Sequence, residues 1–125
     1  YLRLRALPEP RTLASAEAWV RRPGEETRRA VQAALETADT GDDLSLVALS
    51  ALYAEGTLGV DRMQQLAAPP GGSEAAAFGV NILAIEAQGL PFPAAADRLI
   101  DRALDIARGG TGQSLPAPAP ATGEA

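Results

Sequence analysis

The sequence predicts an all-α fold, a compact bundle of about five helices with short antiparallel connections. Apolar residues recur at the spacing of one helix face in several segments, and clusters of glycine and proline divide the 125-residue chain into pieces of helix length. Alanine, the strongest helix former, is the most abundant residue, and aromatic residues make up only 4% of the chain, so the core must be built from small aliphatic side chains. A short solenoid of helical repeats is the alternative, but no fixed-period repeat supports it.

Three helices are predicted in the first half of the chain. Thr12 is the expected N-cap of the first helix, which reaches about Arg21. The second helix starts at Pro23 and continues to about Ala38, with two glutamates in its first turn, where the helix dipole favours acidic groups. The third spans 44–55 and has apolar residues on two faces, a pattern typical of a helix sandwiched between neighbours.

Two longer helices are predicted in the second half, after a short helical turn near Asp61. One spans 73–88 and is apolar almost all round, so we expect it to be the central and most buried helix. The other begins at Pro93 or Ala94 and ends at Arg108, whose cation suits the negative end of the helix dipole.

Changes in composition mark the predicted limits of the domain. Residues 1–11 are expected to be the end of a truncated upstream element, which Pro8 and Pro10 cut off. The helical domain is expected to span 12–110. Residues 111–125, in which proline alternates with alanine, are predicted to form an extended, disordered tail.

The chain contains no histidine, cysteine or lysine, and arginine supplies all eleven cations. The missing residues are the usual neutral-pH bases, thiolate nucleophiles, Schiff-base amines and transition-metal ligands. We therefore expect no enzymatic activity and no cofactor, although chemistry based on carboxylates alone stays open. No apolar run is long enough to cross a bilayer and no signal peptide is visible, which predicts a cytoplasmic location away from the membrane.

The net charge of −5 is unevenly distributed along the chain. Residues 1–30 carry an excess of arginine, whereas residues 31–125 are strongly acidic. We expect the two parts to attract each other within one fold. The alternative, a basic phosphate-binding patch, is weak because the sequence pI of about 4.6 is far below that of nucleic-acid-binding domains. No nucleic-acid partner is therefore expected.

The last predicted helix carries the most prominent polar pattern. Three aspartates follow one another at i, i+4 and i+8 and so share one face. Arginines three residues away from them predict a solvated, salt-bridged surface, which we take as the candidate partner-binding face. That face consists of Asp97, Asp101, Arg102, Asp105 and Arg108. The alternative is a site for a hard cation, which would need oxygen ligands from a second element.

Three other features each allow a structural and a functional interpretation. Glu86 lies on the most apolar helix, where we expect it to reach water, and the alternative is a buried acid catalyst. Trp19 is expected in the core, and the alternative is an exposed anchor at an interface. Four arginines near the start of the second helix could clamp an anion, but the neighbouring glutamates are close enough to neutralise them. These arginines are Arg21, Arg22, Arg28 and Arg29.

Several blocks of the sequence match a family pattern. They are Leu7-Pro8-Glu9-Pro10, Ala16-Glu17-Ala18-Trp19-Val20-Arg21-Arg22-Pro23-Gly24-Glu25-Glu26-Thr27-Arg28-Arg29, Tyr53-Ala54-Glu55-Gly56-Thr57-Leu58 and Leu104-Asp105-Ile106-Ala107-Arg108-Gly109. On these blocks, which cover about residues 7–110, the chain resembles a family of small bacterial helical proteins classed only as a domain of unknown function. It departs from the pattern at Arg22, Gly24 and Tyr53. The resemblance implies an accessory or adaptor protein encoded near type VI secretion genes, and it carries no functional residues over.

These observations lead to an expected function as a protein–protein interaction or adaptor module, accessory to a bacterial secretion system. The alternative is an acidic immunity or antitoxin-like protein that masks a basic toxin through fast, salt-sensitive association. A carboxylate-only enzyme or a metal-binding domain is the least favoured of the three. Under the first two interpretations the partner is another protein.

Overall fold

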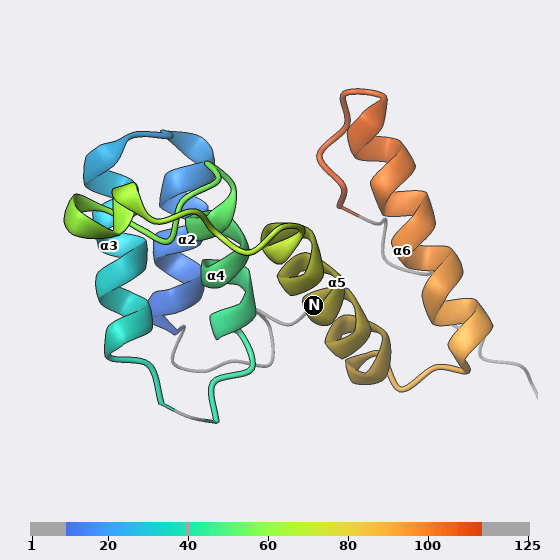
Figure 1. Cartoon of the computed structure of the whole chain (residues 1–125). Coiled ribbons are helices and arrows are strands. Elements are labelled where there is room, and N and C mark those ends of the chain that lie inside the picture. Colours follow the sequence, from blue (N-terminus) through green and yellow to red (C-terminus); the bar gives the residue numbers. More distant parts are fainter. Residues whose placement is uncertain (1–9, 40, 114–125) are drawn as a thin grey trace, which may run out of the picture.

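The computed structural model of the chain describes residues 10–39 and 41–113, and it is helical throughout this part of the chain (Figure 1). The α-helices are α2 (Arg11–Arg21), α3 (Glu25–Glu36), α4 (Ser45–Tyr53), α5 (Gly72–Ala87) and α6 (Phe92–Ala107), and a 3-10 helix, η1 (Asp61–Gln65), lies between α4 and α5. Within the described ranges there is no strand, only a single isolated bridge between Thr57 and Ala67. The prediction of an all-α fold with five main helices is confirmed.

The start of the first helix differs from the prediction in an informative way. α2 begins at Arg11 behind Pro10, so Thr12 lies inside the first turn and is not the N-cap. Its side chain is buried and donates a 2.7 Å hydrogen bond to Oδ2 of Asp42. The hydroxyl therefore joins α2 to the turn before α4 instead of capping its own helix.

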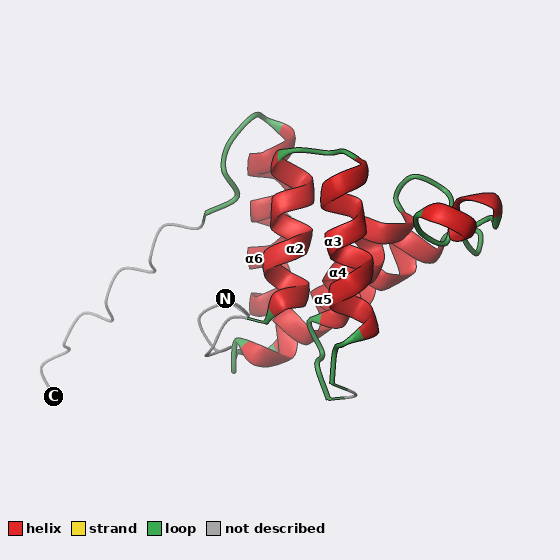
Figure 2. Cartoon of the chain, turned by 90° about the vertical axis from the view of Figure 1, so that its left-hand side faces the viewer, coloured by secondary structure: helices red, strands yellow, loops and turns green. Residues whose placement is uncertain are grey.

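Three helices form the main body of the molecule. α2 and α3 run side by side in opposite directions, and α4 packs against both of them (Figures 1 and 2). The buried cluster at their centre consists of Ala16, Val31, Ala48, Ala51 and Leu52, with Trp19, Leu35, Val47 and Tyr53 packed around it. α4 contacts α2, α3 and α5, which confirms the prediction of a sandwiched helix for the segment with two apolar faces.

The predicted central position of residues 73–88 is wrong. α5 lies at the edge of the main body, where it packs against α4 on one side and α6 on another. Ala76 is its only buried residue, and Phe78 is 67% exposed. The physical reason is that α2 and α3 already close the other sides of α4, so one apolar arc of α5 has no helix to cover it.

α6 stands apart from the three-helix body, on the far side of α5 (Figure 1). Its substantial packing within the described residues is on α5, where Ala95 is fully buried. Residues 109–113 then fold back along the last turn of α6, so the ordered domain continues past the predicted limit at residue 110. The upstream segment of residues 1–9 and the remaining tail of residues 114–125 lie outside the described residues.

Candidate protein-binding surface

All five residues of the predicted partner-binding face lie on α6 or directly at its end. The side chains of the three aspartates and of Arg108 are exposed, and Arg102 is half-buried. Arg108 is the C-cap of the helix, where its backbone N–H bonds the carbonyls of Leu104 and Asp105. The face is therefore present, but its members do not share one role.

Two members of the face hold the loop that follows α6. Nε of Arg102 donates a 2.6 Å hydrogen bond to the carbonyl of Gly112, and Oδ2 of Asp105 accepts one of 2.9 Å from the N–H of the same glycine. Gly112 is buried with φ of +70°, and a Cβ there would lie 2.6 Å from Cδ1 of Ile106. The positive φ favours glycine at this position. Because Arg102 and Asp105 bind this loop, Asp97, Asp101 and Arg108 are the members of the face that are left for a partner.

The ion pairs predicted along α6 are not formed. Within residues 10–39 and 41–113, no arginine nitrogen lies within 4 Å of a carboxylate oxygen on this helix. Arg102 instead turns to the loop carbonyl, and the side chains of Arg98 and Arg108 extend into solvent. The aspartates also do not converge with other ligands, since the described residues contain no group of three or more carboxylates placed to hold a metal ion.

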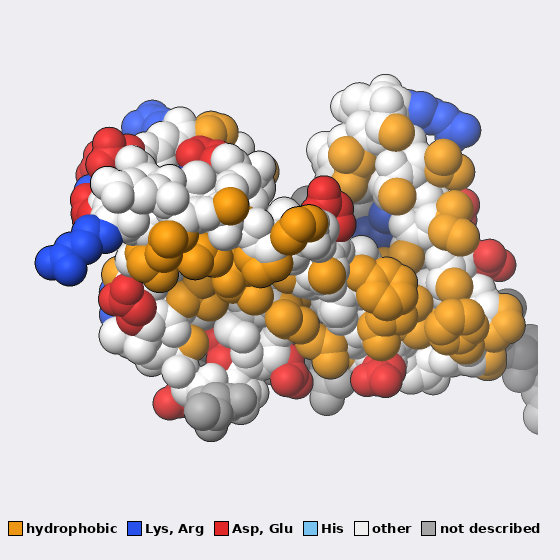
Figure 3. Space-filling view, viewed as in Figure 1, with side chains coloured by type: hydrophobic (Ala, Val, Ile, Leu, Met, Phe, Trp, Pro, Cys, Tyr) orange, Lys and Arg blue, Asp and Glu red, His pale blue; other side chains and the backbone are white. Residues whose placement is uncertain are grey.

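Beside these charges runs an apolar surface that the sequence analysis did not assign to binding. Phe92, Ile100 and Leu104 on α6 are 64%, 56% and 44% exposed. With three alanines at helical spacing they form a continuous band that we call the α6 stripe. The α6 stripe consists of Phe92, Ala96, Ile100, Ala103, Leu104 and Ala107. Hydrophobic side chains gather over α5 and α6 on the face shown in Figure 3, and the exposed Phe78 of α5 adds to this exposed apolar surface.

The same helical spacing that defines the α6 stripe was available in the sequence. Residues 92, 96, 100, 103 and 107 recur every three or four positions, which is the pattern of an amphipathic helix. Such a pattern predicts that the face is covered, either by the rest of the domain or by another molecule. The structure leaves it open because, among the described helices, α6 packs substantially on α5 alone.

One of the four arginines near the second helix has a structural role that the sequence analysis missed. Arg28 is only 3% exposed and donates hydrogen bonds to the carbonyl of Leu52 (2.9 Å), to the carbonyl of Thr57 (3.2 Å) and to the Thr57 hydroxyl. Its guanidinium also lies 3.5 Å from the carboxylate of Glu55. The signal was its position, because Arg28 stands three residues before Val31 on the apolar face of the helix.

The adjacent arginine forms an exposed ionic contact. Arg29 donates two hydrogen bonds to the carboxylate of Asp61 and one of 3.0 Å to Glu25. The hydrogen bonds and the charge of Arg29 lower the pKa of Asp61, and Asp61 in turn raises the pKa of Arg29. These contacts and the pair between Arg28 and Glu55 join the arginine-rich start of the chain to the acidic remainder, as the charge distribution predicted.

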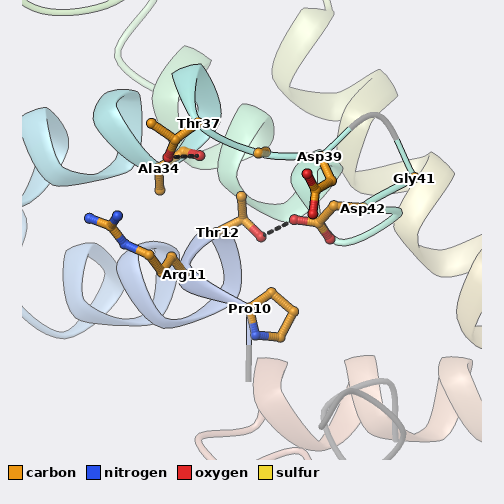
Figure 4. A pocket seen from close by; sticks show the side chains of 9 residues that line it. Pro10, Arg11, Thr12, Ala34, Thr37, Asp39, Gly41 and Asp42 are labelled. Carbon is orange, nitrogen blue, oxygen red and sulfur yellow. Dashed lines mark hydrogen bonds between the residues drawn. The ribbon is translucent and has the colours of Figure 1, made fainter. Parts of the chain in front are cut away.

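A pocket of about 520 Å³, lined by both polar and apolar groups, lies where α2 begins, close to the turn before α4 (Figure 4). Thr12 and Asp42 point toward each other across it, while the guanidinium of Arg11 points away. Both carboxylate oxygens of Asp42 are engaged, since Oδ1 accepts a 3.0 Å hydrogen bond from the N–H of Leu44. The contact between Thr12 and Asp42 therefore braces the start of α2 against the turn before α4.

Trp19 and Glu86 are found in the structural roles that the sequence analysis favoured. Trp19 packs against the central cluster, and its Nε1 is buried with no hydrogen-bond partner in the described part of the chain. It borders a mainly apolar groove of about 440 Å³ between α2 and α4. Glu86 is exposed on α5, so it is not a buried acid.

The comparison with protein families identifies the chain. A family of unknown function (DUF6931) matches residues 2–107, which is most of the chain, and the protein belongs to this family. No curated protein and no solved structure matches the chain. None of the described helices combines the length and the apolar character needed to span a membrane.

Proposed function

We propose that the protein is a protein–protein interaction module, an adaptor that binds its partner through the α6 stripe and the charged residues beside it. The observation that carries this proposal is the exposure of Phe92, Ile100 and Leu104 on one helix face. Large apolar side chains exposed together cost free energy in water, and such patches are typical of interaction sites. The aspartates at positions 97 and 101 border the stripe and would give the contact a polar rim.

Binding without catalysis is the proposed mode of action. The whole chain has no histidine, cysteine or lysine, so the usual general bases and nucleophiles are missing. The resemblance to small bacterial helical proteins supports a narrower proposal, a cytoplasmic accessory protein of a secretion system. The partner would then be a component or an effector of that system.

A second candidate function is that of an acidic immunity or antitoxin-like protein. It is favoured by Asp97 and Asp101, which are exposed and form no ion pair with any described residue. A basic toxin would neutralise them, and its binding would weaken steeply as salt increases. An adaptor that binds mainly through the α6 stripe would keep its partner at high salt.

The test is affinity capture with the tagged protein and two matched variants, each washed at low and at high salt. Leu104→Glu places a charge in the α6 stripe, whereas Val20→Glu places the same charge at a 68% exposed position on α2. We expect Leu104→Glu to lose the specific partners and Val20→Glu to retain them, with the helical circular dichroism of both variants unchanged. If both variants capture the same proteins as the unmodified chain, the proposed binding surface is wrong.

A further inference from the structure

We propose that the α6 stripe binds a second copy of this chain, so that two α6 helices pair in antiparallel orientation around a two-fold axis. The inference rests on the proposed function, because a second copy would occupy the same surface and would compete for it with the adaptor's partner. Three features of α6 carry it: the shape of the stripe, the charges on one of its borders, and the fixed end of the helix.

The stripe is suited to close packing against another helix. Large and small residues alternate along it, with three alanines among Phe92, Ile100 and Leu104. Small residues let two helix axes approach closely, and large ones fill the spaces beside them. If the two-fold axis passes between Ile100 and Leu104, each isoleucine of one copy meets a leucine of the other, and these exposed side chains at the centre of the stripe become buried.

The charges select a second copy in antiparallel orientation. Arg108 follows Asp97 by about three helical turns, so the two side chains lie on the same border of the stripe, Asp97 in the second turn of α6 and Arg108 directly after its last residue. A two-fold axis between residues 102 and 103 brings Asp97 of each copy level with Arg108 of the other. Self-complementarity of this kind is the requirement for an isologous interface. In a parallel pair, by contrast, the two-fold axis runs along the helices and puts this border of the two copies on opposite sides of the seam, so neither Asp97 nor Arg108 gains a partner.

The loop after α6 does not obstruct the antiparallel pairing of two α6 helices. Residues 109–113 bind on the side of the helix that carries Arg102 and Asp105, and the side chain of Arg108 remains exposed. The stripe itself is short, at most the 16 residues of α6, so the interface is at the small end of specific interfaces and the dimer is weak. Dimerisation is therefore expected to depend on concentration over the micromolar range.

The first experiment measures mass by sedimentation equilibrium of the full chain over a wide concentration range. We expect a monomer–dimer equilibrium, and a dissociation constant that rises about tenfold or more for Asp97→Arg and for Arg108→Asp, since each swap makes two attractive pairs repulsive. The double swap restores both pairs and should restore the affinity. Leu104→Glu should remain monomeric, and Val20→Glu should dimerise like the unmodified chain.

The second experiment tests the orientation, and the absence of natural cysteines makes it clean. In the antiparallel pair residue 103 lies beside the axis, so Ala103→Cys should form a disulfide-linked dimer. Residue 107 would lie about 13 Å from its counterpart, measured along the helices, which is too far for a disulfide. Ala107→Cys should therefore form no disulfide-linked dimer. A parallel pair would link both variants, and that result would overturn the proposal.

The proposal and the proposed function fail in different ways. A chain that stays monomeric at every concentration, or a dimer that is insensitive to Leu104→Glu, overturns the pairing of two copies. Loss of captured partners in the Leu104→Glu variant would still support the adaptor function in that case. A dimer that weakens with Leu104→Glu but ignores the charge swaps overturns the antiparallel register.

Discussion

Arg28 and Arg29 are neighbours in α3 with the same guanidinium group, and their surroundings are opposite. Arg28 is buried and satisfies two backbone carbonyls at the end of α4 and in the loop that follows, whereas Arg29 meets two exposed carboxylates at the surface. A buried group that satisfies several acceptors is costly to remove, because the acceptors lose their partners and a cavity remains. An exposed ion pair contributes little, because water and salt screen it.

We therefore expect Arg28→Ala to lower the free energy of unfolding by about 3 kcal/mol. The matched variant Arg29→Ala should have a much smaller effect. Urea denaturation followed by circular dichroism measures both. Equal losses in the two variants would show that burial of the Arg28 guanidinium does not stabilise the fold.

The contact between Arg29 and Asp61 also predicts a pH dependence. Because Arg29 lowers the pKa of Asp61 in the folded chain, the ionised carboxylate stabilises the fold at pH values above its ordinary pKa of 3.8. This contribution is lost as the pH falls through the lower pKa of the folded state. The stability advantage of the unmodified chain over Asp61→Asn should accordingly be constant near neutrality and disappear in acid.

The control for this pH dependence is the same substitution in a chain that lacks the arginine. In the Arg29→Ala background, Asp61→Asn should change stability by a similar amount at all pH values, since the pKa of Asp61 is then close to its ordinary value. Denaturation series between pH 2.5 and 7 would compare the four chains. A pH dependence that persists without Arg29 would assign the effect to another group.

At the scale of helices, periodicity and punctuation were enough to locate every element but not to rank their burial. α4 and α5 both read as apolar on more than one face, and only α4 is enclosed. The sequence pattern shows that a face avoids water, and it does not show whether the same domain or another molecule covers it. In the candidate site, the charged face on α6 was predictable from helical spacing. The return of Gly112 onto Arg102 and Asp105 was not, because it depends on the backbone path of residues 109–113, which helical periodicity does not encode.

The loop of residues 109–113, which packs on the last turn of α6, allows a prediction about the stability of this helix end. Gly112→Ala would place a methyl group against Ile106 at a backbone angle that side chains rarely adopt. We expect it to detach residues 109–113 and to lower stability by about 1 kcal/mol or more. Amide hydrogen exchange in the last turn of α6 should accelerate. Gly24→Ala is the control, since its backbone is extended and no atom lies near the added methyl group, and it should leave exchange in α6 unchanged.

The described part of the molecule consists of two regions that differ in how many neighbouring helices stabilise them. α2, α3 and α4 contact one another around a shared buried cluster, whereas α6 depends on its packing against α5 and α5 on its packing against α4. Regions with few buried contacts open at lower free energy than the rest of a domain. We infer that α6, and with it part of α5, can unfold while the three-helix body stays intact.

The lone tryptophan makes this testable. Trp19 lies in the three-helix body, and α5 and α6 are the two longest helices at 16 residues each. At low protein concentration, denaturation followed by circular dichroism should begin before the change in Trp19 fluorescence. Coincident transitions would mean that the five helices unfold as one cooperative unit.

The contacts of Gly112 with α6 also determine where a fragment of the chain can end without disturbing this helix. The family pattern stops at residue 107, within the last turn of this helix, and the contacts of Arg102 and Asp105 lie five residues farther on. A tag or a fusion attached at the family limit would expose the final carbonyls of α6 and release both side chains into water. For a minimal fragment that keeps the helix intact, the practical boundary is after Gln113.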